Sequence, residues 1–225
     1  MNSGLRKTIP GREPTAKERQ QSASLDRAMM ARCIALSIES GEQGEYPYGV
    51  VIWRSDKLVA EATNRVAHEH DVTRHAEVVA ISHAQKALQP TSLDDCTIYV
   101  NAEPCAFCSY AIRESRIGRV VFGLRSPHMG GVSKWNMLAD DGLSKAIPAT
   151  FAPPPEILAG FMSYEAEQAL LGWNPLMWGV VKQRGLFVAG PVEVVPARDA
   201  TRRKGLTEWL MAVLRRVVFD RFGRK

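Results

Sequence analysis

Apolar residues recur along the chain with two different spacings, and each spacing predicts a different kind of element. Leu25, Met29, Cys33 and Leu36 lie three or four residues apart, which is the spacing of one face of a helix, and glycines soon after residue 40 end the pattern. Compact runs rich in β-branched and aromatic residues instead predict buried strands. Four such strands are expected, at residues 47–53, 57–62, 97–100 and 119–123.

Three further stretches have helical spacing. One is expected to begin near Thr73 and to end near Leu88, before Pro90. Another is expected over residues 106–115, directly after a strand, and a third over residues 156–172. The pattern therefore predicts strands and helices that follow one another along most of the chain.

The two ends differ from the middle of the chain. Residues 1–24 are polar and predict a flexible N-terminal arm, whereas residues 25–173 predict one domain. Residues 174–225 are expected to form a C-terminal extension that starts with a short apolar segment, which would cover the active site or a subunit interface. The extension is expected to end in a basic amphipathic helix over residues 200–222. Packing on the core or on a partner is the first use expected for that helix, and a membrane surface or RNA is the alternative.

Composition narrows the class of protein. The chain has 225 residues, of which 45% are hydrophobic and 24% charged, as in ordinary globular proteins. No apolar run approaches the ~20 residues of a membrane span. The N-terminus resembles neither a signal peptide nor a transit peptide, and four cysteines suggest no disulfide framework. A reduced, cytoplasmic location is therefore expected.

The net charge of +5 is concentrated at the ends of the chain. Residues 1–24 carry +3 and residues 197–225 carry +6, which leaves −4 on residues 25–196. The basic composition therefore does not indicate a nucleic-acid-binding face on the body, although the basic ends could still contact phosphates.

The residues that carry chemistry lie between positions 75 and 108. His75, Cys105 and Cys108 supply one imidazole and two thiols, and three protein ligands leave a fourth position for water on a tetrahedral zinc ion. Zinc lowers the pKa of such a water to about 7. Glu77 lies two residues after His75, where its carboxylate could carry the proton of that water. The alternative, buried or redox thiols and a core histidine, is disfavoured because all these groups occur together.

The pattern H-x-E followed by P-C-x-x-C resembles the cytidine deaminase superfamily. The resemblance covers residues 25–173 and is to the branch of bacterial tRNA-specific adenosine deaminases and guanine deaminases. Four other segments carry it: Pro47-Tyr48-Gly49, Asn64-Arg65, His70-Asp71 and residues 115–123. It implies an α/β fold, a three-layer α/β/α sandwich with a five-stranded mixed sheet, to which this chain adds a C-terminal helical extension. It also implies a homodimer, one Zn²⁺ per chain and hydrolytic loss of an exocyclic amine as ammonia.

The resemblance also implies roles for single residues. His75, Cys105 and Cys108 match the zinc ligands, and Glu77 matches the proton shuttle. Asn64 matches the residue that hydrogen-bonds the base, and its amide offers both a donor and an acceptor. The remaining candidates for substrate contacts are the backbone of Ala76 and the side chains of Tyr48 and His70. Their alternatives are a turn at Asn64, a core position for Tyr48 and a solvated His70.

Departures from the family pattern bear on the substrate. Val72-Thr73-Arg74 stands where the tRNA enzymes usually have Pro, Thr and Ala, and the segment from 124 to 155 is longer and apolar. Asp140 or Asp141 could replace the acidic residue that guanine deaminases place after the preceding strand. A purine base or nucleoside, such as guanine or adenine, is therefore favoured as substrate. Adenosine at the wobble position of tRNA is the alternative, supported by residues 115–123. A remoter alternative is a non-catalytic binding module that uses zinc only to fold, although such a site needs no Glu77.

Overall fold

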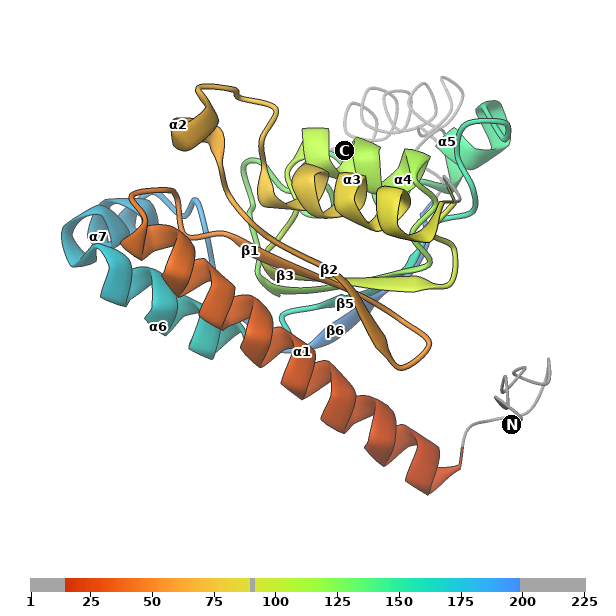
Figure 1. Ribbon diagram of the computed structural model, residues 1–225, viewed down its shortest axis with the longest axis horizontal. Helices are drawn as coiled ribbons and strands as arrows, with labels where there is room; N and C mark the ends of the chain where they lie inside the picture. The colour runs from red at the N-terminus through yellow and green to blue at the C-terminus, as the bar shows by residue number, and fades with distance from the viewer. Residues whose placement is uncertain (1–14, 90–91, 199–225) are drawn as a thin grey trace, which may run out of the picture.

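The computed structural model describes residues 15–89 and 92–198, and these form an α/β sandwich around one mixed sheet (Figure 1). The six strands lie in the order β2-β1-β3-β4-β5-β6. The strands β3, β4 and β5 are parallel to one another, and the other neighbouring pairs are antiparallel. The strand bounds are β1 Gly49–Arg54, β2 Lys57–Thr63, β3 Cys96–Ala102, β4 Arg119–Leu124, β5 Glu156–Ala159 and β6 Glu193–Val195.

Helices cover both faces of the sheet, which confirms the three-layer architecture. In Figure 1, α3 and α4 lie above the sheet and α1 and α6 below it. A cluster of buried apolar side chains fills each interface between helices and sheet. The helix bounds are α1 Ala16–Glu42, α2 Val66–Glu69, α3 Ala76–Leu88, α4 Ala106–Glu114, α5 Asp141–Ala146, α6 Ser163–Trp173 and α7 Pro175–Gln183.

The N-terminal helix is longer than the sequence pattern predicts. It begins at Ala16, so residues 16–24 are helical and are not part of a flexible arm. Thr15 and Glu18 form a capping box, in which the Thr15 hydroxyl accepts a bond from the Glu18 backbone and the Glu18 carboxylate accepts one from the Thr15 backbone. Residues 15–24 are exposed, so no apolar stripe marked this part of the helix.

The expected helix over residues 156–172 is wrong in its first part. Residues Glu156–Ala159 form β5, whose Ile157 and Leu158 pair in parallel register with Val120 and Val121 of β4. Only Ser163–Trp173 is helical. In a run of four residues, the spacing of apolar residues cannot distinguish a strand from the first turn of a helix. The contact with β4 therefore determines its structure.

The C-terminal extension adds structure beyond the expected five-stranded sheet. Its helix α7 packs against α6, and β6 pairs with β5 to become the sixth strand. The amphipathic helix expected over residues 200–222 lies outside the described residues. Within the described ranges, no helix is both long and apolar enough to cross a membrane.

Candidate active site

His75, Cys105 and Cys108 come together as the sequence predicts. Their potential ligand atoms all lie within 4.8 Å of one another. The Nδ1 atom of His75 is 3.7 Å from Sγ of Cys105 and 3.3 Å from Sγ of Cys108. A tetrahedral zinc ion with Zn–S of ~2.3 Å and Zn–N of ~2.1 Å places such atoms about 3.6 Å apart. The three side chains therefore fit one zinc ion, with Nδ1 as the ligand atom of the imidazole.

Two helix N-termini bring these ligands together. His75 is the N-cap residue of α3, and Cys105 is the N-cap residue of α4, directly after β3. The free backbone N–H groups and the positive dipole end of a helix favour negative charge at such positions. The hydrogen bond with Cys108, and then the neighbouring His75, lower the pKa of the Cys105 thiol to about 4, although burial opposes them. At Cys105 the local structure therefore favours thiolate, the form that binds metal, whereas the hydrogen bond with Cys105 and burial raise the pKa of the Cys108 thiol.

Glu77 lies beside the metal-ligand cluster, in the first turn of α3. Its side chain is buried, and burial raises the pKa of its carboxyl group, as does the nearby charge of Cys105. A carboxyl group with a raised pKa holds a proton more readily than an exposed one, which suits a group that moves protons near neutral pH.

A cavity of about 250 Å³ opens onto the cluster. This volume is below the ~300–1,000 Å³ that is typical of pockets for drug-sized ligands. Its walls are mainly apolar, with a few polar groups among them. The lining residues are Tyr46, Tyr48, Asn64, Val66, His75, Glu77, Ala102, Glu103, Cys105, Ser126, Met129 and Phe187.

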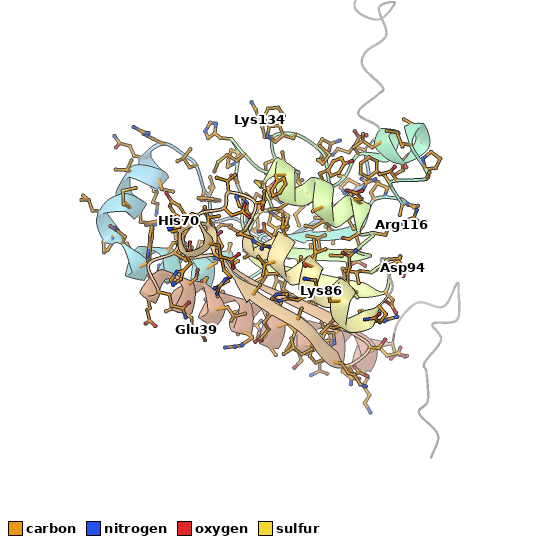
Figure 2. The ribbon with its side chains drawn as sticks, turned by 45° about the horizontal axis from the view of Figure 1, so that its top comes forward. Glu39, His70, Lys86, Asp94, Arg116 and Lys134 are labelled. Atoms are coloured by element: carbon orange, nitrogen blue, oxygen red, sulfur yellow. The ribbon has the colours of Figure 1, made fainter. Side chains whose placement is uncertain are left out.

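The structure brings two of the other four predicted site residues to this cavity. Tyr48 and Asn64 line it, and Ala76 is buried between the ligand His75 and Glu77 as the first residue of α3. His70 does not line the cavity, because it lies exposed at the end of α2 (Figure 2). Asp140 also lies elsewhere, as the N-cap of α5.

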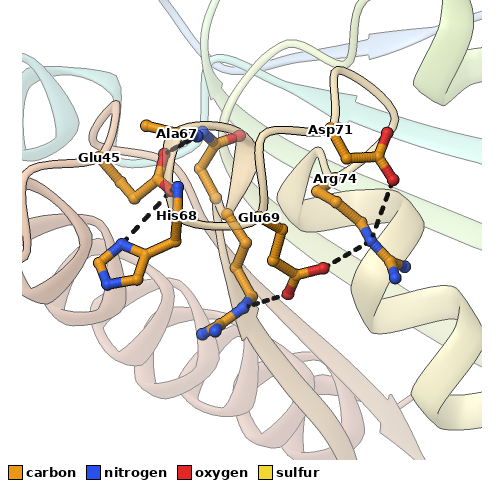
Figure 3. Close-up of polar contacts among 8 residues, drawn as sticks. Glu45, Ala67, His68, Glu69, Asp71 and Arg74 are labelled. Atoms are coloured by element: carbon orange, nitrogen blue, oxygen red, sulfur yellow. Dashed lines mark hydrogen bonds and ion pairs between the residues drawn. The ribbon is translucent and has the colours of Figure 1, made fainter.

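Asn64 is held by a buried carboxylate that the sequence pattern did not single out. Its Nδ2 atom donates a hydrogen bond of 2.9 Å to Oε2 of Glu45. The backbone N–H groups of Ala67 and His68 donate to the same carboxylate, at 3.2 Å and 2.7 Å (Figure 3). Burial raises the pKa of Glu45, but these three hydrogen bonds outweigh it and lower the pKa. Glu45 is therefore an ionised acceptor for all three donors.

Glu103 is another buried carboxylate that lines the cavity, and the sequence pattern did not single it out. It accepts hydrogen bonds from the backbone N–H groups of Ser126, Val132 and Ser133, and from the hydroxyl of Ser133. The only signal in the sequence was its position directly before Pro104 and Cys105. Glu103 thus fastens the segment after β4 to the strand end that carries the thiols.

Two glycines permit this close contact. A Cβ atom at Gly130 would collide with the Glu103 carboxylate, and one at Gly131 would collide with Ser109. The backbone N–H of Gly131 also donates to the carbonyl oxygen of Pro104 at 2.8 Å. The dipeptide therefore lets the segment after β4 pass directly over the start of α4.

Phe187 supplies a wall of the cavity from the C-terminal extension. The extension was expected to reach the active site through the apolar segment that starts at Asn174. In the structure that segment forms α7, whose Trp178 is buried in the apolar cluster that also contains side chains of α1 and α6. The contact with the cavity comes instead from the residues after α7.

Comparison with known proteins places these features in a family. The model of the cytidine and deoxycytidylate deaminase zinc-binding region matches residues 23–124. The tRNA-specific adenosine deaminase of Aquifex aeolicus (strain VF5) is 38% identical over 113 residues, which are 50% of this chain and 75% of that protein. Some relatives are much longer, and the chain spans 11% and 20% of two of them.

Solved structures show the same fold. A structure from studies of A-to-I editing by tRNA:A34 deaminases superimposes with a TM-score of 0.55 and 29% identity, over 64% of this chain and 99% of that one. A guanine deaminase from Nitrosomonas europaea gives a TM-score of 0.54 with 22% identity, over 78% of this chain and 98% of that one. The second likeness concerns the fold alone. The zinc-binding match contains the whole predicted ligand set, and Phe187 lies outside it.

Proposed function

Because this chain belongs to the family of zinc-binding cytidine and deoxycytidylate deaminases, we propose that it is a zinc-dependent hydrolase that removes an exocyclic amine from a nucleobase ring. Water adds to the ring carbon that carries the amine, the C–N bond breaks, and the products are a ring carbonyl group and ammonia. The observation that carries the proposal is the meeting of the three-ligand cluster and a buried carboxylate, Glu77, at one cavity.

The chain's own residues divide the work of this reaction. Zinc, when held by His75, Cys105 and Cys108, supplies a Lewis acid that makes water nucleophilic at neutral pH. Glu77 acts as the general acid and base. Its carboxylate takes a proton from the attacking water, delivers a proton to a ring nitrogen, and protonates the departing amine.

We propose a small purine, such as guanine or adenine, as the substrate. The small, mainly apolar cavity supports this choice, because a flat heterocycle presents two apolar faces and a polar edge. The amide of Asn64 and the backbone of Ala76 contact the polar edge, and Tyr48 packs against the ring. The −4 charge of residues 25–196 also favours a substrate without phosphates over a polyanion.

Adenosine at the wobble position of tRNA is the second candidate substrate. The relative from Aquifex aeolicus, named as a tRNA-specific adenosine deaminase, favours it. Binding of tRNA would weaken steeply as salt rises, because each neutralised phosphate releases counterions. Turnover of a neutral base has no such dependence.

The test is to measure ammonia release from free purines, free pyrimidines, their nucleosides and an anticodon stem-loop RNA, each at two salt concentrations. We expect turnover of a free purine that is insensitive to salt. If only the RNA releases ammonia, and the rate falls as salt rises, the substrate is adenosine in tRNA and not a free purine. If none of these compounds releases ammonia, the remaining hypothesis is a non-catalytic binding module that uses zinc only to fold.

The family resemblance also leads us to propose a homodimer. On α4, Phe107, whose ring packs edge-on against that of His75, exposes 47% of its surface, and Tyr110 exposes 44%; a second copy would cover such apolar side chains. Sedimentation equilibrium of the full chain tests this, and a mass of one chain at micromolar concentration would contradict it.

A further inference from the structure

One wall of the cavity comes from outside the part of the chain that the deaminase family model matches. That model ends at residue 124 and includes the metal ligands, Glu77 and Asn64. Phe187 lies far beyond it, yet lines the same cavity and exposes only 9% of its surface. The chemistry common to the family therefore resides in one part of the chain, and this wall resides in another.

The backbone around Phe187 is bound directly to the segment that follows β4. Arg125 and Val188 exchange two backbone hydrogen bonds of 2.9 Å, as in an antiparallel bridge. The hydroxyl of Ser126 donates to the carbonyl oxygen of Leu186 at 3.1 Å. Because neighbouring residues of extended chain point to opposite sides, Phe187 is buried while Val188 is 44% exposed.

A salt bridge fixes the same segment a few residues further on. Nη2 of Arg125 lies 2.6 Å from Oε2 of Glu193, at the start of β6, and β6 in turn pairs with β5 of the sheet. The segment that carries Phe187 is thus connected to the sheet at two places, by the backbone bonds to Arg125 after β4 and by β6, which pairs with β5. A wall held in this way is part of a preformed pocket.

Phe187 completes a row of aromatic rings along the cavity. Its ring centroid lies 6.2 Å from that of Tyr48, and Tyr48 lies 6.5 Å from Tyr46. Aromatic rings pack against the π-faces of nucleobases, and each such contact contributes about 1–3 kcal/mol to binding. Asn64, His75 and Glu77 provide the polar groups of the same cavity.

We propose that Phe187 is a specificity-determining residue, whose ring packs on the substrate heterocycle and narrows the cavity so that a free nucleobase is preferred to one attached to ribose or RNA. The inference rests on the proposed deaminase function. It follows from the small volume of the cavity and from the fixed backbone, which prevents the ring from moving aside for a larger substituent.

The experiment compares steady-state ammonia release by the wild type, Phe187→Ala, Phe187→Leu and Val188→Ala, with a free purine base and with its nucleoside. Loss of the stacking contact should raise KM for the base about 5- to 150-fold in Phe187→Ala, and should leave kcat within about threefold. The ratio of kcat/KM for base over nucleoside should fall at least fivefold. Phe187→Leu should show a smaller effect of the same kind. Val188→Ala keeps the same backbone contacts and should behave as the wild type.

Each other outcome overturns the inference. An unchanged ratio in Phe187→Ala means that the ring does not select the substrate. A second outcome is that kcat falls equally for the base and the nucleoside in Phe187→Ala, and by the same factor in Phe187→Leu. This outcome means that Phe187 only supports the fold. Failure of the proposed function is distinct, because the wild type itself would then release no ammonia from any free base.

Discussion

Asn64 donates its side-chain N–H to the buried carboxylate of Glu45, with Nδ2 and Oε2 2.9 Å apart. An ionised carboxylate only accepts hydrogen bonds, so the amide must turn its Nδ2 atom toward Glu45. An amide side chain can otherwise take two orientations, which exchange its oxygen and nitrogen atoms, and the bond to Glu45 selects one of them. The Oδ1 atom accepts no hydrogen bond from the residues that the structure describes, and Asn64 lines the cavity. Glu45 therefore sets which atoms of Asn64 are offered to a substrate.

Replacing Glu45 by Gln should raise KM for the substrate by about 5- to 30-fold, with little change in kcat. The Gln side chain has one acceptor oxygen for three converging donors, so Asn64 would lose its fixed orientation, at an expected loss of about 1–2 kcal/mol in binding. Steady-state ammonia release checks this. The control is Glu69→Gln, because Glu69 is an exposed carboxylate nearby that pairs with Arg65 and Arg74 (Figure 3).

A double substitution separates positioning from general damage. If Glu45 acts through the amide, Glu45→Gln should add little to the effect of Asn64→Ala, because the group it orients is already gone. Fully additive effects on KM would show that Glu45 acts on the substrate by another route.

Acid should reduce the contribution of Glu45 to stability. Its pKa in the folded protein is lowered from the ordinary 4.5, so the stabilisation is present above pH 4.5 and is lost as pH falls through the folded pKa. We expect the gap in unfolding free energy between the wild type and Glu45→Gln, about 1–2 kcal/mol at pH 6, to shrink on acidification toward pH 3. Urea unfolding at several pH values measures it. Loss of metal in acid affects both proteins, so the difference isolates Glu45, and a constant gap would contradict the prediction.

The sequence predicted the metal-ligand cluster and the central strands because their signals are local. A His two residues before a Glu, and two Cys three positions apart after a strand, leave few other ways to arrange the ligands. Glu103 and Phe187, which line the cavity, and Glu45, which holds the cavity residue Asn64, were missed because their partners lie far away in sequence. The carboxylate of Glu45, for example, is bound by residues 19 to 23 positions later.

Two elements were misjudged for a related reason. Residues 16–24 lacked an apolar stripe, although Thr15 and Glu18 carried a helix-start signal. Residues 156–159 are too few to show whether their apolar residues follow the spacing of a helix or of a strand. They form a strand because they pair with β4. The spacing of apolar residues identifies elements that bury one face. It does not identify elements that are specified by a helix cap or by a tertiary contact.

Replacing Glu77 by Gln should lower kcat about 100- to 10,000-fold and leave the zinc content unchanged. The amide cannot take up and release the proton that the reaction moves, whereas its size preserves the packing around the first turn of α3. Ammonia release and elemental analysis on the same sample check both parts. Retention of more than a tenth of the wild-type kcat would exclude Glu77 as the proton carrier.

Replacing Cys108 by Ser should reduce bound zinc well below one ion per chain, because a hydroxyl is a poor ligand beside a thiolate and an imidazole. The matched control is Cys33→Ser, since Cys33 is also a buried thiol but lies outside the cluster. Elemental analysis gives the metal content. Because metal binding contributes to the stability of the folded state, a chelator should lower the Tm of the wild type and of Cys33→Ser more than that of Cys108→Ser.

Arg113 should matter for the stability of the segment after β4 much more than for the chemistry. Its buried guanidinium donates from Nη1 to the carbonyl oxygens of Met137, Leu138 and Asp140. From Nη2 it donates to Ser144 and Ala152. Arg113→Met would leave these acceptors without their donor, which should destabilise the fold by about 3 kcal/mol.

Arg116→Met is the comparison for that substitution, because Arg116 follows α4 closely but is only partly buried. Among the described residues, its side chain makes one hydrogen bond, to the carbonyl oxygen of Ala149. We expect Arg116→Met to change stability by less than about 0.5 kcal/mol. The cavity residue Ser126 belongs to the same long segment but is tied to Glu103, so KM should change less in Arg113→Met than in Phe187→Ala. Urea unfolding and ammonia release measure the two effects. Equal stability of the two arginine variants would show that other contacts hold residues 137–152 in place.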